Sequence, residues 1–242
     1  MAKICLCLTG KTLSRDLELI EKYRKYIDMA ELRVDCLEPD ERFFIRRFPE
    51  LAGIPVILTV RRTMDGGHYN GGEGSRIAIL SRGLAFAESD KRHNFAFVDL
   101  EEDLDVPGLE EAVRTFGTRI IRSSHNLEAI GDITGKIRSL RKIGDEIAKV
   151  VVTPHNLVDV LDIYRSCRDN PTGEKIVLGL GDFGINTRIL AEHLGSFISY
   201  VSALEEPDLP GAPGQINPRD MVEWYRFREI RARPWPCNKL IA

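Results

Sequence analysis

Hydrophobic positions gather in eight short runs along this 242-residue chain. Each run has the length of a β-strand, and the stretches between the runs repeat apolar residues with the spacing of an amphipathic helix. Residues 13–27, 75–90 and 157–169 are such helical stretches. Alternating strands and helices in this number predict a single-domain α/β fold, the (β/α)8 TIM barrel. The apolar runs lie at residues 3–10, 29–37, 55–61, 95–101, 119–125, 148–154, 175–181 and 197–203.

Two segments rich in glycine and proline interrupt this alternation. Residues 65–75, DGGHYNGGEGS, follow the third apolar run, and residues 205–215, EEPDLPGAPGQ, follow the eighth. Both are typical of flexible loops, and both come after a strand, at the end where TIM barrels place their active sites. We expect the barrel to occupy residues 1–228 and residues 229–242 to form a C-terminal tail, to which the sequence assigns no role.

The charged residues of the runs fall on one side of the predicted strands. Because successive side chains of a strand point to opposite faces, residues of equal parity share a face. In the second run Glu31, Arg33 and Asp35 share one face, whereas Leu32 and Val34 occupy the other. The apolar face packs on the helices, so the charged face is expected to point into the barrel. The other runs add to this inward face Thr59, Arg61, Asp99, Glu101, Ser123, His125 and Lys149.

Lys149 lies inside an otherwise apolar run, residues 147–152. A lone lysine of this kind is commonly a strand-edge residue that reaches solvent, and buried ion pairs can also serve only to fill a barrel. Burying an unpaired charge costs several kcal/mol, however, so charges on five inward faces indicate a built site. A lysine in low dielectric near arginines loses basicity, and its neutral amine can attack a ketone to give an imine. A nearby histidine, such as His125, could then move a proton on the neighbouring carbon.

Composition narrows the class of protein only slightly. The 34 basic and 37 acidic side chains give a formal net charge of −3, which does not indicate binding to nucleic acid. The apolar runs are too short to cross a membrane, and the N-terminus lacks the features of a secretory signal. We therefore expect a cytoplasmic protein with reduced cysteines, and no CxxC pair or zinc-ligand spacing indicates a metal site. The five cysteines are Cys5, Cys7, Cys36, Cys167 and Cys237.

Seven short segments, in order along nearly the whole chain, resemble the type I 3-dehydroquinate dehydratases, lyases of the shikimate pathway. They are ELRVD, ILTVR followed by DGG, VDLE, SSHN, KVVVTP, TRILAEHLGS and APGQ. Each segment is weak evidence alone, whereas seven in family order are specific. The resemblance implies an enzyme of aromatic amino acid biosynthesis that removes water from 3-dehydroquinate to give 3-dehydroshikimate. It also implies a lysine Schiff base, with no cofactor and no metal.

The resemblance assigns roles to individual residues. Lys149 would form the imine with the substrate ketone, and His125 would remove the adjacent proton and then help water to leave. Glu31 would support the histidine. The residues implied to bind or enclose the substrate are Arg33, Arg61, Arg188, Tyr200 and Gln215, the last on a loop that closes over the site.

The chain departs from the family pattern in this lid loop and at one acidic position. The family usually has a serine four residues before the lid glutamine, where this chain has Gly211, so that hydroxyl contact to the substrate is not assured. Asp65 stands where a glutamate is common. Residues 223–230, EWYRFREI, resemble the segment that joins this domain to shikimate dehydrogenase in two-domain relatives. A homodimer and an association with a shikimate dehydrogenase are both left open.

Three alternatives have weaker support. Residues 179–184, GLGDFG, satisfy the GxGxxG dinucleotide fingerprint, with Glu205 about 20 residues further on, but only one strand follows them. A Schiff-base aldolase acting on a phosphorylated sugar would use a phosphate site at strands seven and eight, whereas Arg188 and Gln215 suit a carboxylate-bearing polyol better. A barrel kept as a binding module would not need the lysine and the histidine.

Overall fold

Each apolar run forms a strand, and the strands pair in parallel around a barrel. The computed structural model describes residues 1–85, 88–141, 143, 145–168, 173–209 and 211–230. The strand order is β7-β6-β5-β4-β3-β2-β1-β8, and a bridge between Lys175 and Ser196 joins the two ends of the sheet. The predicted TIM barrel is confirmed. The strands are β1 (Lys3–Leu8), β2 (Met29–Arg33), β3 (Val56–Thr59), β4 (Phe97–Glu101), β5 (Arg119–His125), β6 (Ile147–Val152), β7 (Lys175–Gly179) and β8 (Ile198–Ser202).

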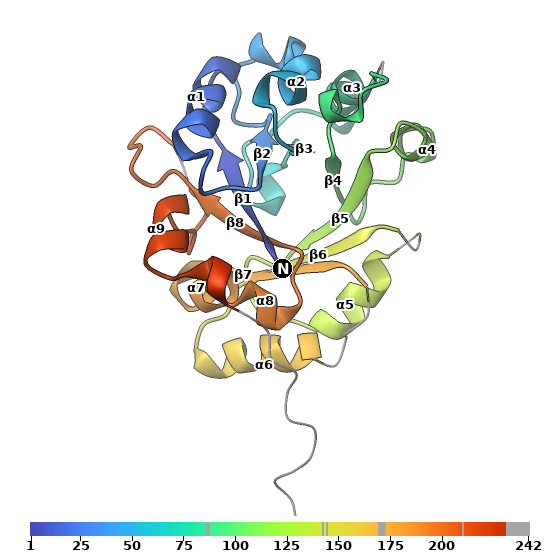
Figure 1. Ribbon diagram of the computed structural model, residues 1–242. Coiled ribbons are helices and arrows are strands. Elements are labelled where there is room, and N and C mark those ends of the chain that lie inside the picture. The colour runs from blue at the N-terminus through green and yellow to red at the C-terminus, as the bar shows by residue number, and fades with distance from the viewer. Residues whose placement is uncertain (86–87, 142, 144, 169–172, 210, 231–242) are drawn as a thin grey trace, which may run out of the picture.

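Helices follow the strands and surround the barrel (Figure 1). The α-helices are α1 (Leu13–Tyr23), α2 (Phe48–Ala52), α3 (Glu73–Leu84), α4 (Pro107–Thr115), α5 (Ile133–Leu140), α6 (Leu157–Arg168), α7 (Gly181–Ile189), α8 (Ala191–Leu194) and α9 (Pro218–Glu223). Short 3-10 helices are η1 (Glu41–Phe43), η2 (Ile45–Arg47), η3 (Thr63–Asp65), η4 (Lys91–His93) and η5 (Phe227–Glu229). Local sequence sets several helix starts. Thr12 caps α1 by accepting a hydrogen bond from the Arg15 N–H, and proline occupies the first turn of α4 and α9.

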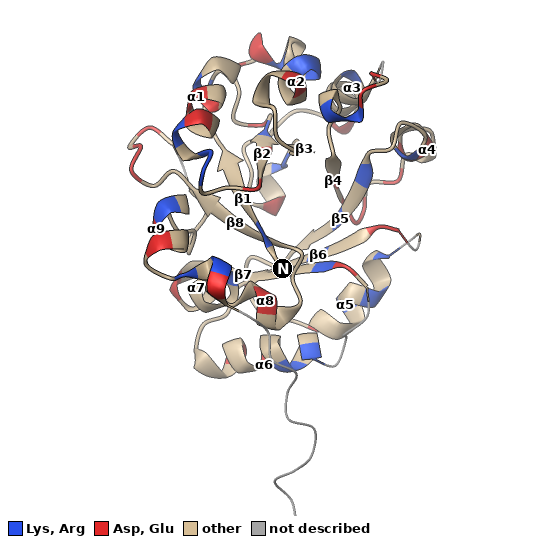
Figure 2. Ribbon diagram, in the orientation of Figure 1, with Lys and Arg blue, Asp and Glu red and all other residues tan. Residues whose placement is uncertain are grey.

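The alternation of side chains along the strands divides the core into two layers. Leu32, Leu58 and Val98 pack outward against the helices, in one apolar cluster. A separate cluster inside the barrel includes Ile57, Ile121 and other residues of the opposite parity. Figure 2 shows charged positions on the strands as well as on the helices. The inward charged face predicted from parity is confirmed, since Glu31, Arg61 and Lys149 line a cavity in the barrel and Asp99 and Glu101 pair with these side chains.

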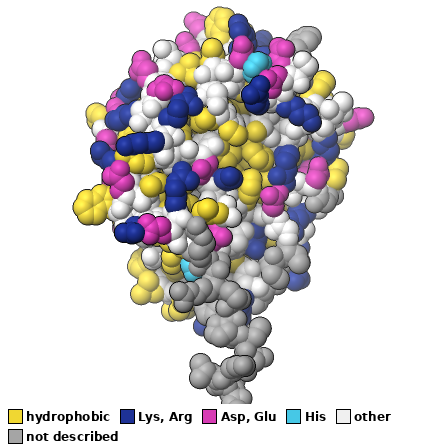
Figure 3. Space-filling model, in the orientation of Figure 1, with side chains coloured by type: hydrophobic (Ala, Val, Ile, Leu, Met, Phe, Trp, Pro, Cys, Tyr) yellow, Lys and Arg dark blue, Asp and Glu magenta, His cyan; other side chains and the backbone are white. Residues whose placement is uncertain are grey.

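Apolar side chains fill the N-terminal end of the barrel. Phe97 begins β4 and Phe197 precedes β8, and their ring centroids lie 5.8 Å apart. The N-terminus lies in the middle of this face, where the space-filling view shows hydrophobic side chains with Lys and Arg around them (Figures 1 and 3). A ligand that reaches the barrel interior therefore enters from the opposite end, where the strands finish.

The GLGDFG segment runs from the last residue of β7 into the first turn of α7 and does not form a dinucleotide-binding unit. A Cβ added at Gly184 would lie 2.3 Å from the carbonyl carbon of Gly179, so this pair of glycines lets helix and strand meet backbone to backbone. β7 pairs with β6 in sequential order, whereas a Rossmann sheet would reverse its strand order here. The glycines therefore serve close packing.

The C-terminal boundary predicted at residue 228 stays a prediction. η5 ends at Glu229, and Arg228 is tied to the barrel by an ion pair with Asp28 at 3.0 Å. The tail that we expected after residue 228 lies, from residue 231 on, outside the described residues. No helix among the described residues is long and apolar enough to span a membrane.

Asp16 is a buried carboxyl in the first turn of α1. Its Oδ1 accepts a hydrogen bond from the Gly10 N–H at 2.9 Å, whereas Oδ2 has no hydrogen-bond partner among the described residues. Burial raises the pKa of Asp16 to about 7. The folded protein therefore holds this proton to a higher pH than the unfolded chain, in which an aspartate titrates near about 3.9.

We expect Asp16 to cost the protein stability as the pH rises from about 4 to about 7, because the unfolded chain releases this proton first. The Asp16→Asn variant keeps an acceptor for the Gly10 N–H but cannot ionise. Its free energy of unfolding, relative to wild type, should rise across this interval and level off above it. Denaturant unfolding at about pH 4, 6 and 8 measures the difference. A difference that does not change with pH would contradict the prediction.

Candidate active site

A cavity of about 520 Å³ opens at the C-terminal ends of the strands. Its walls come from the inward faces of β1, β2, β5, β6, β7 and β8 and from segments that follow the strands, chiefly those after β3, β7 and β8. All eight residues that the sequence predicted for the site line this one cavity. They are Glu31, Arg33, Arg61, His125, Lys149, Arg188, Tyr200 and Gln215.

Lys149 points from the middle of β6 into the barrel, as predicted. Its Nζ lies 2.7 Å from Oδ2 of Asp99 and 3.6 Å from Oε1 of Glu31. The ammonium also lies 4.4 Å from the centre of the Tyr200 ring, a cation–π distance. The sequence suggested arginines as the neighbours that would set the chemistry of this amine, and the structure instead gives it two carboxylates in direct contact.

Asp99 is the carboxylate that connects the lysine to the rest of the interior. Its Oδ2 lies 2.8 Å from Nη2 of Arg61, and its Oδ1 accepts a hydrogen bond of 2.5 Å from the Ser123 hydroxyl. Burial alone would raise the pKa of Asp99, but the positive charges of Arg61 and Lys149 hold it well below its usual range. Parity places Asp99 inside the barrel but does not pair it with Lys149. The register that sets β5 between β4 and β6 brings them together.

Glu31 contacts the lysine and not the histidine. Its two oxygens accept hydrogen bonds from the Thr59 hydroxyl at 3.0 Å and the Cys7 thiol at 3.3 Å. In contrast, Nδ1 of His125 is buried and has no hydrogen-bond partner among the described residues. Glu31 is held on the Lys149 side of the cavity, and its predicted support of the histidine stays a prediction.

His125 is the last residue of β5 and lies half-buried at the cavity wall. Burial, followed by the positive charges of Arg61 and Lys149, lowers the pKa of His125 well below its usual range. The imidazole is therefore neutral near pH 7 and can accept a proton. The positive charges of Arg61 and Lys149 disfavour the protonated imidazole, so His125 is suited to act as a base.

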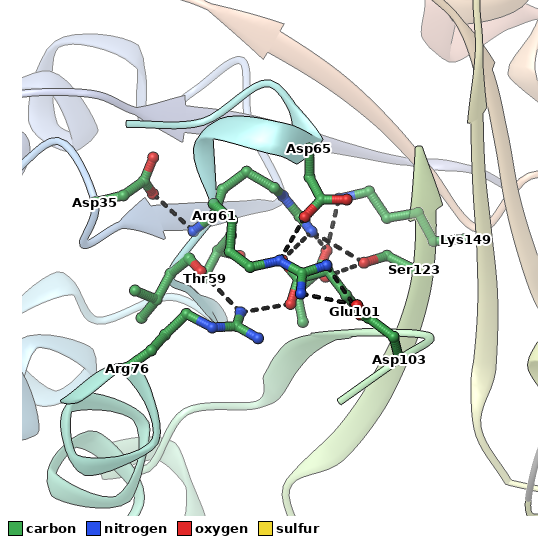
Figure 4. Close-up of polar contacts among 12 residues, drawn as sticks. Asp35, Thr59, Arg61, Asp65, Arg76, Glu101, Asp103, Ser123 and Lys149 are labelled. Atoms are coloured by element: carbon green, nitrogen blue, oxygen red, sulfur yellow. Dashed lines mark hydrogen bonds and ion pairs between the residues drawn. The ribbon is translucent and has the colours of Figure 1, made fainter. Parts of the chain in front are cut away.

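A chain of ion pairs runs from Arg61 through the barrel wall (Figure 4). Nη1 of Arg61 lies 2.7 Å from Oε1 of Glu101, and Oε2 of Glu101 lies 2.5 Å from Nη1 of Arg76 on α3. Arg76 in turn pairs with the partly exposed Glu73 at 2.6 Å. Each buried charge thus has a partner of opposite sign, which such charges need in order to remain ionised.

Arg33 is paired within its own strand. Its Nε and Nη2 donate to Oδ1 and Oδ2 of Asp35 at 2.9 and 2.7 Å. Asp35 also accepts hydrogen bonds from the backbone N–H groups of Arg61 and His68. The predicted substrate-binding Arg33 therefore lines the cavity with its charge compensated, and the same carboxylate holds the glycine-rich loop after β3.

Arg188 differs from the other two arginines of the cavity, Arg33 and Arg61, because no acidic group among the described residues pairs with it. It is 1% exposed, and Nε and Nη1 have no hydrogen-bond partner among the described residues. Nη2 donates to the backbone oxygen of Pro213 in the lid at 3.3 Å. Burial lowers the pKa of Arg188 to about 10. A buried guanidinium with two free donors is a ready site for an anion.

The cavity wall next to the lid is formed by Tyr200 and Cys7, and the lid residue Gln215 contacts it. The buried Tyr200 hydroxyl has no hydrogen-bond partner among the described residues. Nε2 of Gln215 donates to the Cys7 sulfur at 3.1 Å, and its Oε1 accepts from the Ala212 N–H at 2.8 Å. The sequence predicts of Cys7 only that its thiol is reduced. Its parity with Cys5, on a strand that pairs with β2, was the signal that it faces the site.

Asp65, at a position where glutamate is common in the proteins that the sequence resembles, lines the cavity. Its carboxylate pairs with Nε of Arg62 at 2.7 Å within η3. Arg62 also pairs with Asp103 at 2.9 Å. The shorter aspartate side chain is therefore held in the loop by Arg62. No group of three or more His, Cys, Asp or Glu residues that could bind a metal occurs in the described part of the chain.

The lid, residues 205–215 with all but residue 210 described, is held from outside by its acidic residues. Glu206 pairs with Nη2 of Arg15 and with Nζ of Lys22, both on α1 and both at 2.6 Å. Glu205 pairs with Arg219 on α9. Inside, Gly211, Ala212, Pro213 and Gln215 line the cavity. The inner side of the lid therefore forms one wall of the cavity, and the predicted mobility of the lid without ligand stays a prediction.

The fold and the cavity define a TIM-barrel enzyme with a buried amine. The family described as type I 3-dehydroquinase matches residues 4–232 of the chain. The 3-dehydroquinate dehydratase of Methanococcus vannielii is 30% identical over 227 residues, which cover 91% of this chain and 97% of that protein. The chain therefore belongs to the type I 3-dehydroquinase family. The predicted family and enzyme class, a hydro-lyase acting as a 3-dehydroquinate dehydratase, are confirmed.

Solved structures agree with this fold. The 3-dehydroquinate dehydratase from Geobacillus kaustophilus superposes with a TM-score of 0.78 at 20% identity, covering 95% of this chain and 93% of that chain. The dehydroquinate dehydratase and shikimate dehydrogenase of S. pombe gives 0.69 at 22% identity, covering 92% of this chain and 44% of that chain. The matched part of the S. pombe protein is less than half of its length, so this chain corresponds to one portion of it.

Glu206 offers a test of how the lid is held. We expect Glu206→Gln to speed protease cleavage within residues 205–215 and to raise the KM a few-fold, because two surface ion pairs are lost. Glu229→Gln is the matched control, since Glu229 pairs with Arg226 at 2.6 Å on the distant η5. The difference between the two variants should shrink at high salt, which screens such pairs. Equal cleavage rates in both variants at low salt would refute the role of Glu206.

Proposed function

We propose that this enzyme dehydrates 3-dehydroquinate through an imine at Lys149. The observation that carries the proposal is the buried Lys149 amine, in contact with Asp99 and Glu31 and facing the same cavity as His125 and the uncompensated Arg188. An amine, a neutral base and an anion site within one pocket suit a β-hydroxy ketone that carries a carboxylate.

The reaction begins at Lys149. Imine formation requires the neutral amine, so the proton of the ammonium must leave first, and the carboxylates of Asp99 and Glu31 are its nearest acceptors. The amine then adds to the ketone carbon, and the ketone oxygen leaves as water. Tyr200 lies against this amine and contributes an apolar ring, whose phenol stays protonated because burial raises its pKa.

His125 performs the proton transfers. The imine makes the neighbouring C–H acidic because its nitrogen can take up the electron pair. Neutral His125 accepts that proton and returns it to the hydroxyl on the next carbon, which leaves as water. Hydrolysis of the product imine then frees Lys149. The lowered pKa of His125 supports this role, since it keeps the base unprotonated at neutral pH.

Arg188 supplies the anion site in this proposal. The other cavity arginines, Arg33 and Arg61, already have carboxylates within 2.9 Å, so the substrate carboxylate finds its uncompensated partner in Arg188. The alternative, a Schiff-base aldolase acting on a phosphorylated sugar, is not favoured, because the family match covers nearly the whole chain. A homodimer and an association with shikimate dehydrogenase stay proposals, and the cytoplasm is the location that suits a biosynthetic enzyme.

Borohydride trapping with 3-dehydroquinate tests the division of labour between Lys149 and His125. Lys149→Met keeps the apolar stem and removes the amine, so both turnover and the trapped adduct should be lost. His125→Ala should lower kcat by about 10²- to 10⁴-fold yet still give an adduct, because imine formation and elimination are separate steps. Intact-protein mass and peptide mapping locate the adduct.

Lys136→Met is the matched control, because Lys136 is a surface lysine that pairs with Glu102 at 2.9 Å. It should behave as wild type in both turnover and trapping. An active Lys149→Met variant, or an adduct mapped to another lysine, would overturn the mechanism.

Arg188→Met tests the anion site. Methionine keeps an apolar stem without the charge, and we expect kcat/KM to fall by an amount equivalent to about 2 to 5 kcal/mol. The same change should raise the melting temperature of the substrate-free protein, because a buried and uncompensated guanidinium is removed. Steady-state kinetics and thermal unfolding measure the two effects. Unchanged kcat/KM would exclude the proposed contact.

A further inference from the structure

Ser202, the last residue of β8, carries a buried hydroxyl that the mechanism does not use. It shares inward parity with Tyr200, and across the sheet it pairs in register with Cys7, which lines the cavity. The residue is 3% exposed, and Oγ has no hydrogen-bond partner among the described residues. A buried hydroxyl without a partner costs free energy that an alanine in the same place would avoid.

The lid glycine lies directly against this hydroxyl. A Cβ added at Gly211 would be 2.7 Å from Oγ of Ser202 and 3.0 Å from Cδ2 of Leu204. Oγ of Ser202 therefore occupies the space into which a side chain at position 211 would point. Gly211 itself lines the cavity, and a serine is usual at this lid position in the proteins that the sequence resembles.

The lid residue over Ser202 is two residues from the one that contacts Arg188. Gly211 is followed by Ala212 and Pro213, and the Pro213 oxygen accepts a hydrogen bond from Arg188. Arg188 has two guanidinium nitrogens, Nε and Nη1, without partners among the described residues. Unpartnered donors thus lie against two nearby lid residues, that of β8 against Gly211 and those of α7 beside Pro213.

We propose that Ser202 is a substrate-binding residue, whose hydroxyl donates a hydrogen bond to the substrate carboxylate held by Arg188. In this chain the strand supplies the hydroxyl, and Gly211 makes room for it. Gly211 lies over Oγ, so the proposed contact requires the lid backbone to shift around the bound substrate. The inference rests on the proposed function, and it assigns a further residue to the carboxylate end of that site.

Moving the hydroxyl between strand and lid tests this assignment. Ser202→Ala should raise the KM for 3-dehydroquinate about 10-fold or more, with a smaller change in kcat and no loss of melting temperature. The double variant Ser202→Ala/Gly211→Ser returns a hydroxyl from the lid side and should restore the KM to within a few-fold of wild type. Gly211→Ser alone should raise the KM, because its Cβ would meet Oγ of Ser202 at 2.7 Å.

Two controls separate binding from structure. Ser139→Ala removes an exposed hydroxyl, bonded to the Lys136 oxygen on α5, and should leave the KM unchanged. In an Arg188→Met background, Ser202→Ala should have a smaller effect than in wild type, because both side chains act on one carboxylate. A purely structural serine would give additive effects and no rescue by Gly211→Ser.

The outcomes distinguish this inference from the function on which it rests. A wild-type protein that neither turns over 3-dehydroquinate nor yields a trapped adduct would overturn the proposed function, and the inference with it. An active wild type with an unimpaired Ser202→Ala variant would overturn the inference alone. So would a double variant that is no better than Ser202→Ala.

Discussion

The ion pair between Lys149 and Asp99 is the interaction on which the barrel interior depends. A lysine cannot stay charged in a closed β-barrel without a counter-ion, and a buried aspartate has the same requirement. Asp99 is therefore shared with Arg61, Arg61 with Glu101, and Glu101 with Arg76. The series ends at the partly exposed Glu73, where water takes part in the solvation. The Lys149 amine at the centre is thus linked, through side chains of alternating charge, to β4, to the segment after β3 and to α3.

Arg188 does not belong to this set of paired charges, because two of its guanidinium nitrogens have no partner among the described residues. The charges near Lys149 are satisfied before substrate arrives, so the amine and its carboxylates are positioned in advance. At the other end of the cavity, burial without a counter-charge lowers the pKa of Arg188 to about 10. In the function proposed above, the free energy lost there becomes available to substrate binding, because the substrate carboxylate relieves it.

The lid, residues 205–215, makes different contacts on its outer and inner sides. Its outer residues, Glu205 and Glu206, are held by basic side chains of α1 and α9, which solvent can compete with. Its inner residues offer little side chain to the cavity, so the backbone of Gly211 can lie against Ser202. A lid held by polar contacts at its edge can open at low cost, whereas its fit over the site depends on a glycine at one position.

The sequence by itself determined the barrel and the contents of its interior, because strand alternation is strictly periodic and parity assigns each side chain to a face. It placed Lys149, His125 and Asp99 inside correctly, and even Ser202 could have been placed so. Only the tertiary structure decided which inward groups meet, since strand register and side-chain length are not readable from parity. In the structure Glu31 contacts Lys149, Asp65 pairs with Arg62, and Arg188 has no acidic partner among the described residues. Pairing is a property of neighbouring strands and loops, which lie far apart along the chain.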